Sequence, residues 1–402
     1  MTPVAGRHVL VTNDFPPKVG GIQAYLWELW SRLDPQSFVV LTASSHAGAA
    51  AFDAEQARRG IRIERVPHRI LYFPTPAARA RIRGLARDVG ASLVLLDPVL
   101  PLGLLGPALG VPYGVVLHGA EAAVPARLPG TRSLLGRVLG DAALIVSAGA
   151  YPAAEATRVL ARARAAHSTR PGTAPAPARP APLHVDVPPG VDCARFAPMD
   201  DDARRAARVR LGLPPDGLVV VSVSRLVPRK GMDVLIEAAR RLRTSYPDLL
   251  VVIAGTGRDA RRLADHVRSS SAPVRLIGRV SEEDKGALLG AADVFAMACR
   301  RRWGGLEQEG FGIVFLEAAA CGIPQVAGDS GGAADAVVDG STGVVVRRPQ
   351  DPGDVAAALR QMLSDARLRR RMGDEARRRA CRDFDYDALA AKLAAALAEV
   401  QG

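Results

Sequence analysis

The sequence predicts an α/β protein made of two doubly wound domains, each a parallel sheet covered by helices. A chain of 402 residues is longer than one core usually supports, so two or three domains are expected. Short apolar segments alternate with longer helical ones, which is the order that parallel sheets with crossover helices require. The alternation stops once, at a stretch rich in proline and alanine, and then restarts.

The first half of the chain contains six short apolar segments that we expect to be strands, at 8–12, 38–42, 61–66, 93–96, 114–117 and 143–146. The first segment leads through a Pro/Gly turn into the helical sequence IQAYLWELWSRL. The Pro/Ala-rich stretch at 167–182 holds five prolines in sixteen residues. It cannot form a packed element, and we expect an exposed, mobile loop there.

After the segment VPPGVDCARFAP the strand-helix pattern restarts. Strands are expected at 219–224, 250–254, 274–277, 294–296, 325–327 and 344–346, and helices at 232–242, 313–321 and 386–400. We therefore place the first domain at 1–188 and the second at 189–383. The remaining segment, 384–402, is expected to be a helix that crosses back to the first domain.

Composition excludes several classes of protein. With 48% apolar and 23% charged residues the chain is not generally disordered. No apolar run approaches the roughly 20 residues of a membrane-spanning helix. Polar residues at 13 and 14 interrupt the N-terminus too early for a secretory signal, so we expect a cytoplasmic protein.

The net charge of +12 is carried by arginine, because only four of the 53 basic residues are lysine. A high arginine count can reflect genome composition alone, with the side chains on solvated faces. Without zinc-finger or RNA-recognition motifs, and with 4% aromatic residues, nucleic acid is not the expected partner. An anionic lipid surface or an anionic small substrate is the more suitable partner for this charge. The first-domain arginines that could contact a lipid surface are Arg79, Arg81, Arg83, Arg127, Arg132 and Arg137.

Four cysteines, at 193, 299, 321 and 381, lie far apart and form no CxxC pair. We expect isolated buried thiols, with neither a disulfide nor a structural zinc site. The motifs also place no aspartate pair at metal-binding spacing, so no metal and no cofactor are expected.

Two glycine-containing turns follow strands and precede helices. In NDFPPKVGGIQ, Gly20 and Gly21 can bring backbone amides close to a phosphate, or simply form a strand-to-helix turn. In SRLVPRKG, Arg225 and Lys230 can face one point at the sheet edge. Both side chains are expected on a solvent-facing loop, where they could stabilise a leaving diphosphate in place of a metal ion. A solvated basic turn is the alternative.

The segment EGFGIVFLE carries two carboxylates, Glu309 on a loop and Glu317 inside the helix that Ile313 opens. One could accept hydrogen bonds from sugar hydroxyls and the other from a ribose, while amides at the helix start hold phosphate. A pair of surface carboxylates is the alternative. His118 ends an apolar strand. It would face a cleft or, alternatively, form hydrogen bonds with the local backbone. The neighbouring sequence offers no Ser and Asp partners for a catalytic triad.

In order along the chain, GGIQ, HGAE, SRLVPRKG, GTGR, LIGRV, EGFGIVFLEAAACGIPQVAG and SGG resemble the family 4 retaining glycosyltransferases of the GT-B fold, which has two Rossmann-like domains. Within that family the chain is most similar to the actinobacterial GDP-mannose-dependent phosphatidylinositol monomannoside mannosyltransferases. The resemblance covers nearly the whole chain.

The resemblance implies roles for individual residues. The catalytic residues would be His118, Arg225, Lys230 and Glu309. The donor would be held by Gly20, Gly21, Arg225, Lys230, Arg279, Val280, Glu309, Gly312, Ile313 and Glu317. On the acceptor side would lie Asn13, Asp14 and Gln23. Enzymes of this family retain the anomeric configuration without a metal.

The chain departs from the subfamily pattern in three places. Ala120 stands in HGAE where the subfamily reads HGHE, and LLDPVLPL stands where it tends to read WFGAAAPL. The Pro/Ala insertion is the third departure. All three lie in the first domain, which selects the acceptor.

We therefore expect a metal-independent retaining glycosyltransferase that moves mannose from GDP-mannose to a phosphatidylinositol mannoside-like lipid, at the inner face of the plasma membrane. One alternative is a related enzyme that uses another nucleotide-sugar and another lipid or soluble acceptor. A second is a non-catalytic sugar-nucleotide binder. The complete set of Arg225, Lys230, Glu309 and Glu317 argues against that second alternative.

Overall fold

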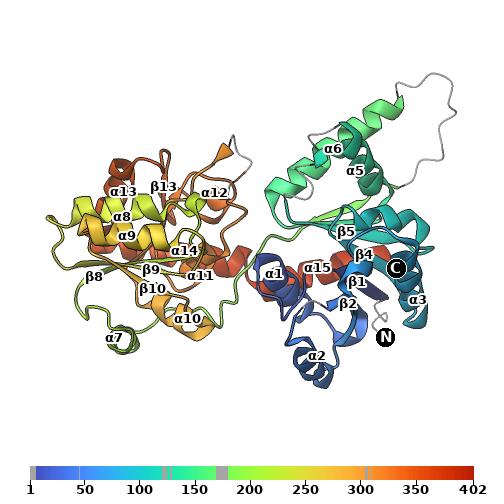
Figure 1. Ribbon diagram of the computed structural model, residues 1–402, viewed down its shortest axis with the longest axis horizontal. Helices are drawn as coiled ribbons and strands as arrows, with labels where there is room; N and C mark the ends of the chain where they lie inside the picture. Colours follow the sequence, from blue (N-terminus) through green and yellow to red (C-terminus); the bar gives the residue numbers. More distant parts are fainter. Residues whose placement is uncertain are drawn as a thin grey trace. The chain divides into compact units, whose positions relative to one another are not determined.

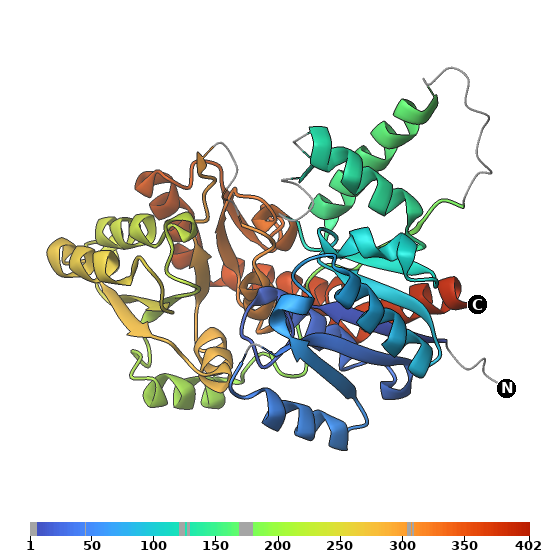
Figure 2. The same cartoon turned by 45° about the vertical axis from the view of Figure 1, so that its right-hand side comes forward.

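The computed structural model in Figures 1 and 2 describes residues 6–402 except 45, 120–124, 127–128, 169–179, 304–306 and 308. The chain divides into two compact units. Unit 1 comprises Met1–Pro189 together with Tyr386–Gly402, and unit 2 comprises Gly190–Asp385. Most of the predicted Pro/Ala loop, and Arg127 and Ala120, lie outside the described residues.

Unit 1 contains a seven-stranded sheet in the order β3-β2-β1-β4-β5-β6-β7, and every adjacent pair is parallel. Its strands are β1 (Arg7–Thr12), β2 (Phe38–Ser44), β3 (Arg62–Pro67), β4 (Ala91–Asp97), β5 (Tyr113–Leu117), β6 (Leu144–Ser147) and β7 (Leu183–Asp186). Six of them confirm the predicted strands. The seventh, β7, was not predicted, because four residues after a proline-rich stretch give no periodic signal.

Helices cover both faces of this sheet. Unit 1 contains α1 (Gly21–Trp30), α2 (Ala49–Arg58), α3 (Pro76–Asp88), α5 (Pro129–Asp141), α6 (Ala150–Ser168) and α15 (Tyr386–Gln401). Buried side chains of α3, α5 and α6 form one core with the sheet, and those of α1 and α15 form the other. Leu389, Leu393 and Leu397 of α15 recur every four residues and are buried, so one stripe of this helix lies against unit 1 (Figure 1).

Unit 2 contains a six-stranded parallel sheet in the order β10-β9-β8-β11-β12-β13. Its strands are β8 (Leu218–Val223), β9 (Leu249–Ala254), β10 (Val274–Gly278), β11 (Val294–Met297), β12 (Gln325–Gly328) and β13 (Gly343–Val346). Its helices are α7 (Asp201–Arg210), α8 (Met232–Leu242), α9 (Ala260–Ser270), α10 (Glu282–Gly290), α11 (Ile313–Ala320), α12 (Ala333–Ala336), α13 (Pro352–Ser364) and α14 (Ala366–Asp383). In Figure 1, α8, α9 and α13 lie on one face and α10, α11 and α14 on the other.

Both sheets reverse their strand order once, between β1 and β4 in unit 1 and between β8 and β11 in unit 2. Connections leave in opposite directions at such a switch point, which opens a crevice beyond the carboxyl ends of the strands. The loops that follow β1, β4, β8 and β11 are therefore where each fold can bind a ligand.

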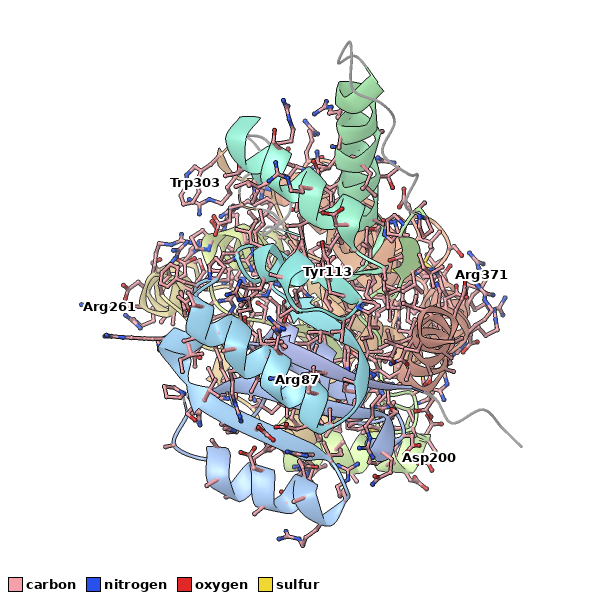
Figure 3. All side chains as sticks on the ribbon, turned by 90° about the vertical axis from the view of Figure 1, so that its right-hand side faces the viewer. Arg87, Tyr113, Asp200, Arg261, Trp303 and Arg371 are labelled. Carbon is pink, nitrogen blue, oxygen red and sulfur yellow. A yellow bond between two sulfur atoms is a disulfide. The ribbon has the colours of Figure 1, made fainter. Side chains whose placement is uncertain are left out.

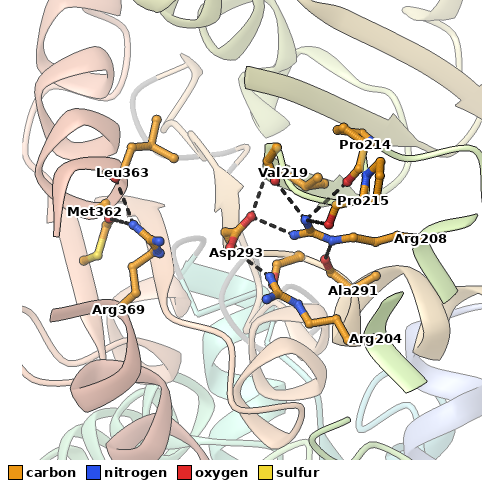
Figure 4. A network of polar contacts seen from close by, with 12 residues as sticks. Arg204, Arg208, Pro214, Pro215, Val219, Ala291, Asp293, Met362, Leu363 and Arg369 are labelled. Atoms are coloured by element: carbon orange, nitrogen blue, oxygen red, sulfur yellow. Dashed lines mark hydrogen bonds and ion pairs between the residues drawn. The ribbon is translucent and has the colours of Figure 1, made fainter. Parts of the chain in front are cut away.

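A buried arginine holds α7 against the sheet of unit 2 (Figure 4). The Arg208 guanidinium, 4% exposed, donates to the carbonyl oxygens of Ala291 at 3.0 Å and Gly217 at 2.8 Å and pairs with Asp293 at 2.8 Å. Asp293 also accepts the backbone N–H of Val219. Each nitrogen of the Arg208 guanidinium has a hydrogen-bond partner. A buried charge is tolerated only when it is paired and hydrogen-bonded in this way.

The segment that enters unit 2 lies beside the segment that leaves it. The N–H of Val191 donates to the carbonyl oxygen of Phe384 at 2.8 Å. Cys193 and Cys381 form a disulfide whose Cα atoms are 5.8 Å apart, so the expectation of four isolated thiols was wrong for these two. Their separation of 188 residues gives no local sequence signal. Cys299 and Cys321 are free and buried.

Arginine side chains project from helices of both units, as Arg87 of α3, Arg261 of α9 and Arg371 of α14 illustrate (Figure 3). Among the described residues, no helix combines the length and the apolar character needed to cross a membrane.

Candidate active site

A glycine brings the two switch-point loops of unit 2 into contact. Gly231 has φ 69°, and a Cβ atom there would lie 1.9 Å from the carbonyl oxygen of Ala298. Only glycine permits both the left-handed conformation and this approach. The turn that ends in Lys230 is thereby pressed against the loop that follows β11.

Lys230 is buried and pairs with Glu309 across this contact. Its Nζ lies 2.7 Å from Glu309 Oε2, and the two residues are 8% and 7% exposed. The expectation that Lys230 faces solvent was therefore wrong. Arg225, on the same loop, is exposed as predicted.

The environment of Glu309 favours its ionised form. Burial alone would raise the pKa of this carboxyl, but the charge and hydrogen bond of Lys230, together with the charge of Arg229 and the hydrogen bond of Cys299, outweigh burial and bring the pKa below its usual value. The Cys299 thiol donates to the same oxygen at 3.5 Å. Burial and the charge of Glu309 raise the pKa of this thiol, so it stays protonated and acts as a donor.

The GDSGG turn, which follows β12, packs closely against the loop that carries Glu309. The N–H of Gly332 donates to the carbonyl oxygen of Glu309 at 3.1 Å, and a Cβ at Gly332 would lie 2.1 Å from the carbonyl oxygen of Gly310. Gly312, with φ 78°, then caps the start of α11. Ile313 is the first residue of that helix, where backbone N–H groups lack intrahelical partners.

Glu317 lies inside α11, buried as deeply as Glu309, and has its own lysine. Lys285 Nζ lies 2.7 Å from Glu317 Oε1, and the Lys285 ammonium also lies 5.3 Å from the centre of the Phe196 ring. Here burial prevails: it raises the pKa of Glu317, and the charge of Lys285 only partly offsets it. Lys285 was not among the predicted residues, although the rarity of lysine in this chain was a usable signal.

Arg279 and Val280 follow β10 at the same sheet edge. The N–H of Gly255, after β9, donates to the carbonyl oxygen of Gly278 at 2.6 Å. Arg279 is exposed, whereas Val280 packs partly against the core of unit 2. The carboxyl ends of β9 and β10 therefore converge beside these two residues.

In unit 1 the glycine turn leads into α1. Gly20 is extended, with φ 171°, and its carbonyl oxygen accepts the N–H of Ala24, while a Cβ at Gly21 would meet nothing within 4 Å. No packing contact within unit 1 therefore requires glycine at position 21. The open space around it is consistent with the close approach of a ligand.

The predicted acceptor-side residues form one cluster with the turn. Asp14 Oδ1 accepts the amide of Gln23 at 2.6 Å and pairs with Lys18 at 2.5 Å. Asn13 donates to the carbonyl oxygen of Leu71 at 2.9 Å, which ties the turn to the loop after β3. These contacts order the turn around Gly20.

His118 directly follows β5, as predicted, and contacts a residue that the sequence analysis did not select. Its Nε2 lies 3.0 Å from Asp97 Oδ1, and Asp97 Oδ2 accepts the hydroxyl of Thr12 at 2.6 Å. Asp97 was noted only as part of a departure from the subfamily pattern. Its neighbours come from strands that are distant in the sequence, so spacing could not reveal the cluster.

The structure therefore brings together Lys230 and Glu309 in unit 2, and His118 and Thr12 through Asp97 in unit 1. Among the described residues there is no group of three or more His, Cys, Asp or Glu side chains placed to hold a metal ion. In unit 2, buried ammonium–carboxylate pairs lie beside glycine-rich turns and a helix N-terminus. That arrangement suits the binding of a diphosphate and a polyhydroxylated sugar.

Comparison with known proteins identifies the family. Residues 203–379 match the family described as glycosyl transferases group 1. The chain is 38% identical over 393 residues to the GDP-mannose-dependent alpha-(1-6)-phosphatidylinositol monomannoside mannosyltransferase of Mycolicibacterium smegmatis, covering 96% of this chain and 97% of the relative. It is 37% identical over 400 residues to the enzyme of the same name from Mycobacterium tuberculosis, with the same two coverages.

Solved structures support the fold. The crystal structure of Anabaena HepE with UDP and glucose matches with a TM-score of 0.75 at 19% identity, covering 98% of this chain and 100% of that one. WaaG, a glycosyltransferase of lipopolysaccharide biosynthesis, matches with a TM-score of 0.65 at 18% identity and covers 96% and 98% of the two chains. Both sheets thus have the GT-B arrangement that the motifs predicted. With its full-length similarity to the mycobacterial enzymes, the chain belongs to the group 1 glycosyltransferases, in the family of the GDP-mannose-dependent phosphatidylinositol monomannoside mannosyltransferases.

Proposed function

We propose that this protein transfers a mannosyl residue from GDP-mannose to a phosphatidylinositol mannoside-like lipid, with retention of configuration and without a metal ion. The observation that carries the proposal is the buried Lys230–Glu309 pair at the switch point of unit 2. It lies in a chain that is 38% identical, over nearly its whole length, to a relative named for that activity.

Unit 2 has a suitable group for each part of the donor. Arg225 and Lys230 bind the diphosphate, and Glu309 then accepts hydrogen bonds from the transferred sugar. The Glu317 carboxylate binds the ribose, and the backbone at 279 and 280 holds the base. The amides that open α11 donate to the phosphate.

The transfer breaks the bond between the anomeric carbon of mannose and the β-phosphate oxygen. On the same face of the sugar, that carbon forms a bond to an acceptor hydroxyl oxygen. The hydroxyl proton passes to the departing phosphate oxygen, so GDP leaves with the proton. Arg225 and Lys230 stabilise the negative charge that develops on the diphosphate.

The test is an assay of the purified protein with radiolabelled GDP-mannose and a phosphatidylinositol monomannoside. We expect labelled lipid from the wild-type protein and a roughly 100- to 1000-fold lower rate from Glu309→Gln. Glu237→Gln is the matched control, because Glu237 pairs with Arg240 on the outer side of α8. Transfer from another nucleotide-sugar, or only to a soluble acceptor, would favour the related-enzyme alternative. Donor binding without transfer or hydrolysis would favour a non-catalytic binder.

Independence from metal is a separate part of the proposal. Two cations already fill the electrostatic role that a divalent ion has in other transferases. We expect activity to survive excess chelator. Loss of activity in chelator, with recovery on adding magnesium or manganese, would contradict this part.

We also propose that unit 1 holds the enzyme at the inner face of the plasma membrane. Arg79 and Arg83 are exposed on α3, and Tyr72 and Phe73 just before it are 52% and 62% exposed. Each basic residue near an anionic surface contributes about 1 kcal/mol, and aromatic side chains favour the lipid interface.

Vesicle co-sedimentation tests the membrane proposal. We expect binding to anionic vesicles that falls as salt rises, and weaker binding after Arg79→Ser with Arg83→Ser. Arg261→Ser with Arg268→Ser, on α9, is the control pair. Equal binding to neutral and anionic vesicles, or none to either, would contradict the proposal and favour a soluble acceptor.

A further inference from the structure

Asp97 is a buried carboxylate at the switch point of the unit 1 sheet. It is the last residue of β4, its Cα pairs in register with that of Thr12 in β1, and it is 2% exposed. In the part of the chain that the structure describes, it has no lysine or arginine partner. A carboxylate in such a position is costly unless hydrogen bonds satisfy it.

Two side chains from neighbouring strands satisfy Asp97. Thr12 donates its hydroxyl to Oδ2 at 2.6 Å, and His118 Nε2 lies 3.0 Å from Oδ1. Because an ionised carboxylate only accepts hydrogen bonds, the proton of the histidine contact is on Nε2. The Thr12 oxygen in turn accepts the N–H of Asp14 at 2.9 Å. The direction of the whole chain of hydrogen bonds is thus defined.

This chain of hydrogen bonds joins the two turns of unit 1 that carry predicted substrate contacts. One turn runs from Thr12 through Asp14 to Gly20, and the other begins at His118. The edge of the Tyr25 ring lies against the His118 ring, with the ring centres 5.5 Å apart, and Tyr25 donates its hydroxyl to the carbonyl oxygen of Val187 at 2.8 Å. The His118 ring is therefore held from two directions.

We propose that Asp97 is a positioning residue for mannosyl transfer: it fixes the orientation of the His118 ring with its proton on Nε2, and through Thr12 it anchors the glycine turn. The proposal rests on the proposed function and on the expectation, from the family resemblance, that His118 is a catalytic residue. A histidine oriented by a buried carboxylate loses its function when the carboxylate becomes an amide, because the amide selects the other tautomer.

The first test is Asp97→Asn, with the exposed Asp88→Asn as control. We expect kcat to fall about 10- to 100-fold with little change in KM for GDP-mannose, because the amide carbonyl oxygen can still accept the Thr12 hydroxyl and keep the glycine turn anchored. In protein labelled with ¹⁵N-histidine, and without donor, the wild-type His118 signal should show a protonated Nε2. In Asp97→Asn it should shift toward the Nδ1-protonated form; His118→Gln assigns the signal.

A second variant keeps the proposal testable if Asp97→Asn does not fold. Thr12→Val removes the hydroxyl but keeps the shape, so the turn loses its anchor while His118 keeps its partner. We expect KM for GDP-mannose to rise several-fold with the His118 signal unchanged, and Thr12→Ser to restore KM.

An unchanged His118 signal in Asp97→Asn would overturn the proposal, and so would a changed signal with wild-type kcat, or an unchanged KM in Thr12→Val. If the wild-type protein transfers no mannose, the proposed function fails, but the NMR comparison still decides whether Asp97 fixes the His118 tautomer.

Discussion

The two units share one strand order, apart from the additional edge strand β7 of unit 1, but have different chemistry at the same topological position. At the switch point of unit 2, an ammonium and a carboxylate from the loops after β8 and β11 form an ion pair. At that of unit 1, the hydroxyl of Thr12 and the carboxylate of Asp97 meet directly at the ends of β1 and β4. The topology supplies a crevice in both units, and the side chains decide what each crevice does.

The difference between the two contacts lies in what a ligand can replace. A diphosphate can compete with Glu309 for Lys230, because both offer anionic oxygens to the same ammonium. Asp97 is 2% exposed, and its hydrogen-bond partners Thr12 and His118 lie at the ends of the two neighbouring strands, so its oxygens are shielded from a ligand. We therefore expect Lys230 to exchange partners when a ligand binds, and the contacts of Asp97 to persist.

The strongest test of this comparison is to remove the two cations of unit 2, Lys230 and Arg225, one at a time. Lys230→Ala and Arg225→Ala should each lower turnover about 100- to 1000-fold, since each removes one charge from the diphosphate site. Only Lys230→Ala should also destabilise the protein, by about 3–5 kcal/mol, because it leaves Glu309 buried without its ammonium. Turnover assays and urea denaturation measure the two effects.

Lys392→Ala is the control for this pair, because that exposed lysine contacts only the carbonyl oxygen of Asp186 among its described partners. Near-normal turnover in Lys230→Ala or Arg225→Ala would remove that residue from the diphosphate site. Equal stability of the two variants would contradict the buried ion pair.

A smaller effect distinguishes the two carboxylates within unit 2. Burial raises the pKa of Glu317, whereas that of Glu309 is lowered, so as pH falls Glu317 is protonated before Glu309. We expect KM for GDP-mannose to rise about tenfold before kcat declines, since a hydrogen bond to a charged group contributes about 1.5–3 kcal/mol. Steady-state kinetics across the acid range measure this order.

Glu317→Gln should show the raised KM at every pH and lose its dependence on acid. If kcat falls before KM rises in the wild-type enzyme, or if Glu317→Gln keeps the wild-type pH profile, the assigned roles of the two carboxylates are wrong.

A third test concerns the stability of unit 1 alone. His8 is buried in β1, accepts the Trp30 indole N–H at 3.0 Å, and has a pKa lowered by burial to about 3. The unfolded chain therefore binds a proton first, near pH 6.5. The contribution of His8 is complete above that pH and is lost as pH falls towards 3, at about 1.4 kcal/mol per pH unit.

Denaturation curves at several pH values measure this loss. His8→Gln should flatten the pH dependence, because glutamine offers Trp30 an acceptor that does not titrate in this range. His46→Gln is the control, since His46 is exposed. If the free energy of unfolding of His8→Gln has the same slope against pH as that of the wild-type protein, His8 is not the cause of the pH dependence.

Much of this fold was predictable because periodic apolar segments mark strands and helices locally. The helix at 232–242 was predicted to the residue, and twelve of the thirteen strands found in the described residues were expected. The motifs also located Glu309, Glu317 and Lys230, which lie on turns and a helix that local sequence defines.

The features that sequence analysis did not predict depend on contacts between segments that are distant in the chain. Lys230 was expected in solvent because its turn reads as polar; Glu309, 79 positions later, and Ala298 enclose it. Asp97 sits in an apolar segment whose neighbours, Thr12 and His118, adjoin it only through the strand order. The pairing of Cys193 with Cys381 depends in the same way on where α14 ends.

The position of α15 has a consequence for how the protein is made. Its leucines complete a core whose other members, such as Leu29 and Trp30, lie near the start of the chain. Synthesis proceeds from the N-terminus, and domains generally fold as units. All of unit 2 therefore leaves the ribosome before that core of unit 1 can close. Until then the growing polypeptide carries an open apolar surface where the final helix will dock, and this surface is a natural binding site for chaperones.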